Sequence, residues 1–168
     1  DPVYILGGFA GILSLDLLLL QPLLAGRYLP GLSVMMSRHL HRWIGLSLVL
    51  AIVVHVAGLW LTSPPDVVDA LLFASPTPFS AWGVIAMWTA FGAALMGVFR
   101  QHLRLRFRLW RLSHTVLAGV TIVGSVVHAM LIEGTMEIMT KTALCTLVLL
   151  ASASALAKLK VWEIRRRP

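Results

Sequence analysis

The sequence predicts an all-α integral membrane bundle of about five transmembrane helices. Of its 168 residues, 58% are hydrophobic and only 12% are charged, and the mean hydropathy is +0.87. A water-soluble domain of this size could not bury so much apolar surface, because its surface-to-volume ratio is too high. Five apolar runs are each near the length that one helix needs to cross a bilayer. The chain is therefore predicted to be a membrane protein.

These five runs fill most of the chain, and we expect residues 1–168 to form a single transmembrane domain. The predicted spans are residues 3–24, 43–61, 79–99, 112–132 and 138–156. The proline-rich connection between the second and third spans contains a short predicted helix, residues 66–73, with Ser63 as its N-cap and proline near its first turn. We expect this helix to lie at the membrane surface as a lid.

The charged residues are distributed unevenly between the connections. Arginines fill the first and third connections and close the chain, whereas the second and fourth connections carry acidic residues; of 14 basic residues, only Lys141 lies on the acidic side. The positive-inside rule then predicts a cytoplasmic C-terminus and an N-terminus outside. This pattern explains the net charge of +7 without a nucleic-acid partner. An arginine-rich loop that docks an acidic partner is the alternative interpretation.

Four of the six histidines are arranged in two pairs within the second and fourth spans. The pairs are His41 with His55, and His114 with His128, and the members of each pair are 14 residues apart. Fourteen residues turn a helix by about 1,400°, roughly 40° short of four turns, so both members face one side. Along the axis they are about 21 Å apart. Pairing His39 with His55 instead would place the two on opposite faces.

The second and fourth spans run parallel, because one span separates them. His41 and His114 are therefore expected at one depth near the cytoplasm, and His55 and His128 at another near the outside. Two helices that offer imidazoles at two matched depths predict two haems, each iron held by two histidines.

Arg38 and Arg111 each precede the inner histidine of their span by three residues. On a helix this spacing puts them on nearly the same face, where they could pair with the propionates of the inner haem. We expect His39 and His102, in basic segments, to be surface residues.

Other interpretations of these histidines stay open. An intramembrane histidine often forms only an interhelical hydrogen bond. A zinc site fits less well, since two histidines at each level leave a tetrahedral ion short of ligands. A transporter with histidines along a proton or metal path would be expected to show broken helices and several polar residues at mid-depth.

Three further residues inside the predicted spans have alternative or specific interpretations. Asp16 is an intramembrane carboxylate and thus either a functional group or a residue protonated or hydrogen-bonded inside the bundle. Trp88 is expected to fill the core, with a position between the haems as the alternative. Cys145, the single cysteine, excludes an internal disulfide and is expected to be a small core residue.

Residues 38–45, 53–55, 110–114 and 126–128 resemble the ferric reductase-type transmembrane domain superfamily. Its members include NADPH oxidases, iron reductases and the haem subunit of bacterial methionine sulfoxide reductase systems. The resemblance implies that His41 and His114 bind the inner haem b and His55 and His128 the outer one. It also implies electron transfer from the cytoplasmic to the outer, periplasmic side, and we expect a bacterial inner membrane protein.

Family members often have six spans and continue into a flavin- and NAD(P)H-binding domain, whereas five spans and no glycine-rich dinucleotide motif are visible here. We therefore expect an oxidoreductase membrane component whose electrons come from another protein, a flavin, a quinol or a domain absent from this sequence, with an acceptor or partner protein outside. The sequence starts at Asp1 without methionine, so a processed N-terminus or a longer chain is expected. The alternative function is a haem-containing accessory subunit of a larger complex.

The predicted orientation can be measured with cysteines in the second and third connections of a Cys145→Ser background. An impermeant thiol reagent added from outside should label Ser75→Cys and not Gln101→Cys, because the arginine-rich connection is expected in the cytoplasm. Labelling of Gln101→Cys from outside would invert the topology.

Overall fold

The fold is an all-α bundle. The computed structural model describes residues 1–102, 104–134 and 136–159, and in these residues it contains six helices and no strand. In chain order they are α1 (Pro2–Ala25), α2 (Val34–Thr62), α3 (Pro64–Leu71), α4 (Pro78–Val98), α5 (Phe107–Leu131) and α6 (Ile138–Leu159). All except α3 are long and apolar enough to cross a membrane, which confirms the five predicted spans.

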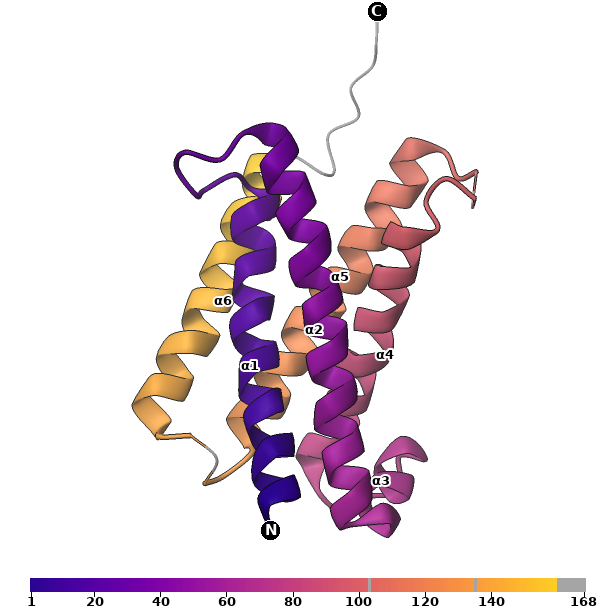
Figure 1. Ribbon diagram of the computed structural model, residues 1–168, viewed down its shortest axis with the longest axis vertical. Helices are drawn as coiled ribbons and strands as arrows, with labels where there is room; N and C mark the ends of the chain where they lie inside the picture. The colour runs from indigo at the N-terminus through magenta and orange to yellow at the C-terminus, as the bar shows by residue number, and fades with distance from the viewer. Residues whose placement is uncertain (103, 135, 160–168) are drawn as a thin grey trace, which may run out of the picture.

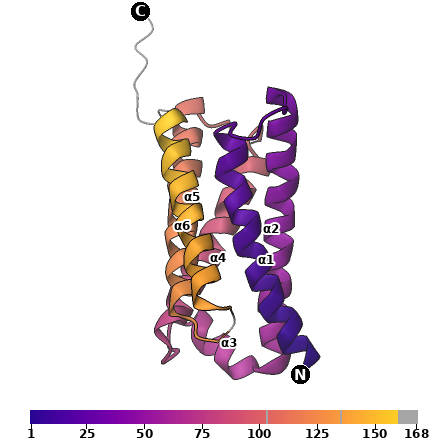
Figure 2. The same ribbon diagram turned by 90° about the vertical axis from the view of Figure 1, so that its left-hand side faces the viewer.

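The bundle consists of two antiparallel helix pairs and one further long helix. α1 packs along α2, and α4 packs along α5, more extensively than any other helices pack (Figure 1). α6 lies against α1 and α5 (Figure 2). The short helix α3 lies at the same end of the bundle as the N-terminus, and the α1–α2 and α4–α5 connections lie at the other end. We call these the α3 end and the arginine-rich end.

Two helices extend further toward the arginine-rich end than the apolar runs predicted. α2 begins at Val34 instead of residue 43, and α5 begins at Phe107 instead of residue 112. Apolar runs mark only the part of a helix that lies in hydrocarbon, whereas the helix itself continues to a residue that caps it. For α2 this residue is Ser33, whose hydroxyl accepts a hydrogen bond from the Met36 amide at 3.1 Å.

The predicted short helix is present and shifted by two residues. α3 spans Pro64–Leu71, with Ser63 at its N-cap position and proline in its first turn. The Ser63 hydroxyl donates to the Asp66 carboxylate at 2.5 Å and makes no hydrogen bond to a backbone amide. Val67 is buried, so α3 is attached to the bundle by one side.

The centre of the bundle is a small apolar cluster. It joins α1, α2 and α6 through buried side chains: Leu15, Leu18, Leu48, Cys145 and Val148. The expectation for Cys145 is confirmed.

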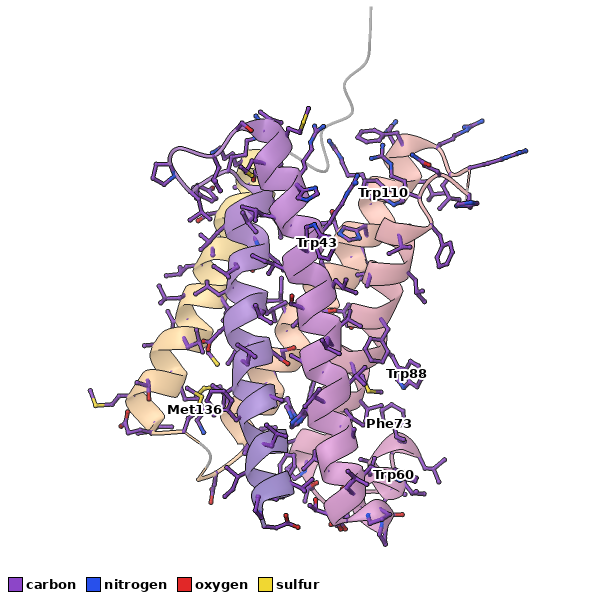
Figure 3. The ribbon with its side chains drawn as sticks, in the orientation of Figure 1. Trp43, Trp60, Phe73, Trp88, Trp110 and Met136 are labelled. Atoms are coloured by element: carbon purple, nitrogen blue, oxygen red, sulfur yellow. The ribbon has the colours of Figure 1, made fainter. Side chains whose placement is uncertain are left out.

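The expectation for Trp88 is wrong. Its side chain is 59% exposed, edge-on to Phe91, and it points away from the bundle (Figure 3). α4 is apolar all round, so its sequence does not specify which side faces inward. The basic C-terminal residues used in the orientation argument, Lys160 and Arg165 to Arg167, lie outside the described residues.

The first helix pair is held together at a contact between two glycines. A Cβ atom added to Gly58 of α2 would lie 2.9 Å from the Cα atom of Gly7 in α1 and 3.2 Å from the Val3 carbonyl oxygen. Both neighbours are backbone atoms, which cannot move without shifting a helix. The α1–α2 crossing therefore requires glycine at position 58.

Replacing Gly58 by alanine should separate α1 from α2 and destabilise the protein by about 1–3 kcal/mol. The measurement is the midpoint of thermal unfolding in detergent. Gly97→Ala in α4 is the matched control, because a Cβ atom there has no neighbour within 4 Å. An equal midpoint for the Gly58 variant and the control would show that this contact does not limit the packing.

Candidate functional site

Four histidine side chains face one another in two pairs across the centre of the bundle. The ring centroids of His41 and His114 are 6.5 Å apart with an interplanar angle of 64°. Those of His55 and His128 are 6.4 Å apart with an angle of 76°. In each pair one ring comes from α2 and the other from α5. The structure thus brings together the residues that the 14-residue spacing groups at two depths.

α2 and α5 carry these histidines but barely contact each other through their backbones. In the described part of the chain, α2 packs mainly on α1, and α5 mainly on α4 and α6. The gap between α2 and α5 is consequently bridged by side chains, and the imidazoles point into it from both sides.

Three of the four imidazoles are fixed by a hydrogen bond to the neighbouring helix. The Nδ1 atom of His55 is 2.8 Å from the Gly7 carbonyl oxygen. His128 makes the same contact with Phe79 at 2.8 Å, and His114 with Ala93 at 3.1 Å. A carbonyl oxygen can only accept, so Nδ1 donates and Nε2 keeps its lone pair. This tautomer is the one in which an imidazole binds a metal through Nε2.

His41 differs from the other three. Its Nδ1 atom is buried and has no hydrogen-bond partner of acceptable geometry. The Gln21 side-chain amide instead donates to the His41 carbonyl oxygen at 3.4 Å. A buried polar atom without a partner is unusual and marks a place where the packing of side chains alone is incomplete.

The partner positions repeat the spacing of the histidines. In α4 the accepting carbonyls belong to Phe79 and Ala93, which are 14 residues apart. In α1 the residues that contact His55 and His41 are Gly7 and Gln21, also 14 residues apart, although at His41 the contact runs from the Gln21 side chain to the backbone. The α1–α2 pair therefore repeats the spacing of the α4–α5 pair. Sequence reasoning missed these partners, because the acceptors are backbone carbonyls of unlike residues and leave no signal in the sequence.

Glycine makes room for both imidazoles of the pair nearer the α3 end. A Cβ atom on Gly11 would lie 2.9 Å from His55 Nδ1, and one on Gly83 would lie 2.7 Å from His128 Nδ1. Each glycine comes four residues after the residue whose carbonyl accepts the hydrogen bond, so one helical turn provides both the acceptor and the space.

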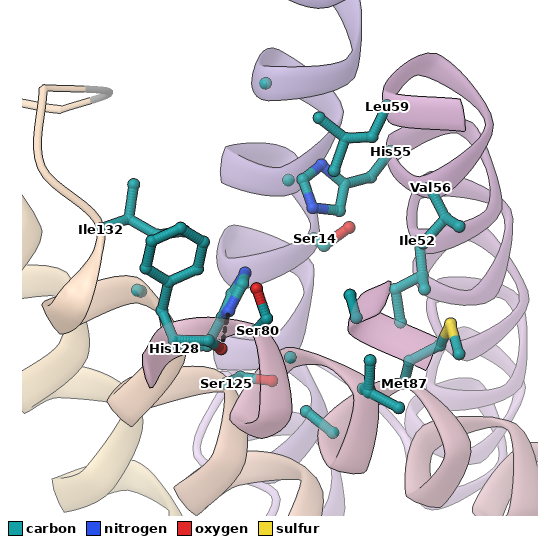
Figure 4. Close-up of a pocket in the computed structure, with 18 of the residues that line it drawn as sticks. Ser14, Ile52, His55, Val56, Leu59, Ser80, Met87, Ser125, His128 and Ile132 are labelled. Atoms are coloured by element: carbon teal, nitrogen blue, oxygen red, sulfur yellow. Dashed lines mark hydrogen bonds between the residues drawn. The ribbon is translucent and has the colours of Figure 1, made fainter. Parts of the chain in front are cut away.

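A cavity of about 690 Å³ contains this second pair of rings. Figure 4 shows His55 and His128 pointing into it from separate helices, with apolar side chains such as Ile52, Val56 and Leu59 around them. The cavity extends toward α3, where Asp66 and Asp69 line it.

The cavity reaches the middle of the bundle at Leu48 and Thr121. Leu48 lies seven positions after His41 and Thr121 seven positions after His114, each on nearly the same face as that histidine, and both are buried. Thr121 donates to the Leu117 carbonyl oxygen at 2.9 Å and lies 3.0 Å from the Thr89 hydroxyl. These side chains separate the two histidine levels.

Aromatic and basic groups surround His114 at the arginine-rich end. The Trp110 ring stacks on His114 at 5.5 Å and 12°, and its Nε1 atom donates to the Met96 carbonyl oxygen at 2.9 Å (Figure 3). The Arg100 guanidinium lies 4.5 Å above the Trp110 ring. This stack covers one face of the His114 imidazole and holds the ring in its orientation.

The two predicted propionate partners lie at the same end. Arg38 is exposed, and Arg111 is partly buried, with its guanidinium 6.0 Å from the Phe107 ring centre. Their role toward a cofactor stays a prediction.

His39 and His102 are exposed, as expected, and His39 Nε2 accepts from Trp43 Nε1 at 2.8 Å. Asp16 is exposed on α1, so the interpretation that it is buried inside the bundle is not supported.

Each histidine pair fits a metal ion that is already coordinated by a planar ligand. Metal–imidazole bonds are about 2.0–2.1 Å long, so imidazoles on opposite sides of one ion have ring centroids roughly 6.3 Å apart. The separations of 6.5 and 6.4 Å agree with this value. The described residues contain no group of three or more His, Cys, Asp and Glu that could hold an ion alone. A haem needs only the two axial ligands that each pair offers.

Comparison with known proteins gives one finding. The profile of a family described as "Ferric reductase like transmembrane component" matches residues 10–125. The matched stretch includes His41, His55 and His114, and His128 follows three residues after its end. No curated protein and no solved structure matches the chain.

Proposed function

The chain belongs to the family of ferric reductase like transmembrane components, and on this premise we propose that it transfers electrons across the membrane through two b-type haems. His41 and His114 hold the inner haem, and His55 and His128 hold the outer one. The observation that carries the proposal is that both pairs of imidazoles have the ring separation of axial ligands, 6.5 and 6.4 Å. When bound, haem iron supplies one-electron chemistry by alternating between its ferric and ferrous states.

The hydrogen bonds at Nδ1 prepare the imidazoles for this role. They fix the tautomer, orient the ring and raise the basicity of Nε2 as a metal ligand. Because each histidine pair would supply both protein ligands of its haem, the iron would carry electrons and would not need to bind a substrate. The protein therefore acts as an electron conduit, and the acceptor reacts outside it.

The middle of the bundle supports electron transfer over the transport of protons or metal ions. Leu48 and Thr121 separate the two histidine levels, and the hydroxyls of Thr121 and Thr89 donate to carbonyl oxygens of their own helices. Each hydroxyl hydrogen is therefore bonded within its own helix, and the long helices are unbroken at this depth. Electrons cross such an apolar gap by tunnelling, whereas an ion would need polar partners along it.

The donor is proposed to approach the arginine-rich end and the acceptor the α3 end. Arg38 and Arg111 pair with the propionates of the inner haem, and the surrounding arginines attract an anionic donor such as a flavin or an acidic protein. A quinol dissolved in the bilayer is the other donor class. The charge distribution between the connections supports an orientation with the arginine-rich end in the cytoplasm. The proposed direction of transfer, from the cytoplasm outward, is the one that the resemblance to ferric reductase-type domains implies.

Purified protein should contain two non-covalently bound b haems per chain, and the two should be separable by mutation. His55→Ala and His128→Ala should remove one component of the reduced-minus-oxidised spectrum, and His41→Ala and His114→Ala the other, because the members of each pair share one iron. A pyridine haemochrome assay gives the haem content of each variant.

His39→Ala and His102→Ala are the matched controls, because both residues are exposed outside the pairs. They should retain both components. Less than about one haem per chain in the fully loaded wild type, or loss of one shared component in His41→Ala and His55→Ala, would refute the arrangement.

Gly83→Ala should also weaken the outer haem site without removing a ligand. The added methyl group would push the His128 ring away from the Phe79 carbonyl, since it would lie 2.7 Å from Nδ1. We expect lower outer-haem occupancy, on the order of tenfold weaker binding as for other losses of a ligand's hydrogen-bond partner. Gly97→Ala is the control, and equal spectra for both variants would contradict this role of the glycine.

A further inference from the structure

Lys141 is the basic residue that does not follow the charge distribution. It lies in the first turn of α6 at the α3 end, where the connections are acidic. Its side chain is only 4% exposed. It lines the cavity that contains His55 and His128, and among the described residues that line this cavity it is the only lysine or arginine. A lysine in this position requires an explanation, because burying an ammonium group is costly unless the charge is paired.

The protein itself provides little compensation for this charge. Nζ donates one hydrogen bond, at 2.6 Å, to the carbonyl oxygen of Ile132. An ammonium group has three donors, and no carboxylate forms an ion pair with Lys141 in the described part of the chain. Asp66 and Asp69 line the same cavity but are exposed. Among the described residues, the buried ammonium group of Lys141 therefore has no carboxylate as an ion-pair partner.

The contact with Ile132 determines where this cation lies relative to the histidines. Ile132 follows His128 by four residues, which is about one helical turn, or roughly 6 Å, toward the α3 end. The ammonium group is held on the outward side of the level that His55 and His128 define. At the opposite end, Arg38 and Arg111 occupy the corresponding place, nearly one turn outward of His41 and His114.

We infer that Lys141 binds a carboxylate of the porphyrin held between His55 and His128. This inference rests on the proposed function. Haem b carries two propionate carboxylates, and the cavity otherwise offers them only neutral and acidic side chains apart from the histidines. An ion pair with Lys141 compensates both buried charges and fixes the side of the cavity toward which the carboxylates point. Lys141 is then a cofactor-binding residue that no spacing in the sequence indicates.

A second consequence concerns the reduction potential. A cation next to one haem stabilises the ferrous form, which carries one positive charge less than the ferric form. Lys141 therefore raises the midpoint potential of the outer haem relative to a site without this charge. A higher potential at the outer haem favours electron transfer from the inner to the outer level.

The test is a redox titration of the wild type and three variants with their haem bound. Lys141→Gln retains a donor for the Ile132 carbonyl and removes the charge, whereas Lys141→Arg retains the charge. Lys158→Gln is the matched control on the same helix, because Lys158 is exposed at the arginine-rich end, 4.5 Å from the Tyr28 ring centre. The component that His128→Ala removes identifies the outer haem.

In Lys141→Gln we expect the ratio of reduced to oxidised outer haem at a given potential to fall about tenfold, which is about 59 mV for one electron. The inner component should not change, Lys141→Arg should restore most of the shift, and Lys158→Gln should leave both components unchanged. Loss of the outer component in Lys141→Gln with retention in Lys141→Arg would support the inference equally. Unchanged potentials and haem content in Lys141→Gln would overturn it and leave Lys141 as a cap of the Ile132 carbonyl. A wild type without haem would instead refute the proposed function.

Discussion

The hydrogen bond from histidine Nδ1 to a carbonyl of the neighbouring helix is the interaction on which the site depends. A backbone carbonyl inside a helix already accepts one bond and has a second lone pair free, so this contact does not break the helix. It connects α2 to α1 through His55 and Gly7, and α5 to α4 through His128 and Phe79. Each helix pair is thereby joined by a side-chain hydrogen bond and presents its imidazoles toward the other pair.

Small residues allow these bonds to form at the right distance. Gly11 and Gly83 leave space for the rings, and the contact between Gly7 and Gly58 lets α1 and α2 approach closely. In a membrane, where lipid is as apolar as a leucine side chain, close van der Waals contact and hydrogen bonds hold helices together. The same residues that pack the pairs thus shape the cavity, and changes in packing reach the site directly.

The charges of the chain are arranged around the two histidine levels. Arginines lie beyond the level of His41 and His114, toward the arginine-rich end. Lys141 lies beyond the level of His55 and His128, toward the α3 end, buried against the Ile132 carbonyl. Between the levels lie the buried apolar side chain of Leu48 and that of Thr121, whose hydroxyl is bonded to the backbone of its own helix. This arrangement suits two anionic groups, each near one end of the bundle, with an insulating layer between them.

The sequence by itself determined the five spans, the short helix after Ser63 and the faces on which the histidines lie. These features depend on local periodicity: apolar runs of bilayer length, a capping residue and a 14-residue spacing that nearly completes four turns. The starts of α2 and α5 were misjudged because charged residues beyond the hydrocarbon continue the helix. The accepting carbonyls, the outward position of Trp88, the exposure of Asp16 and the burial of Lys141 were decided only by the tertiary structure. A helix that is apolar all round, such as α4, does not encode its own rotation, which is set where it meets its neighbours.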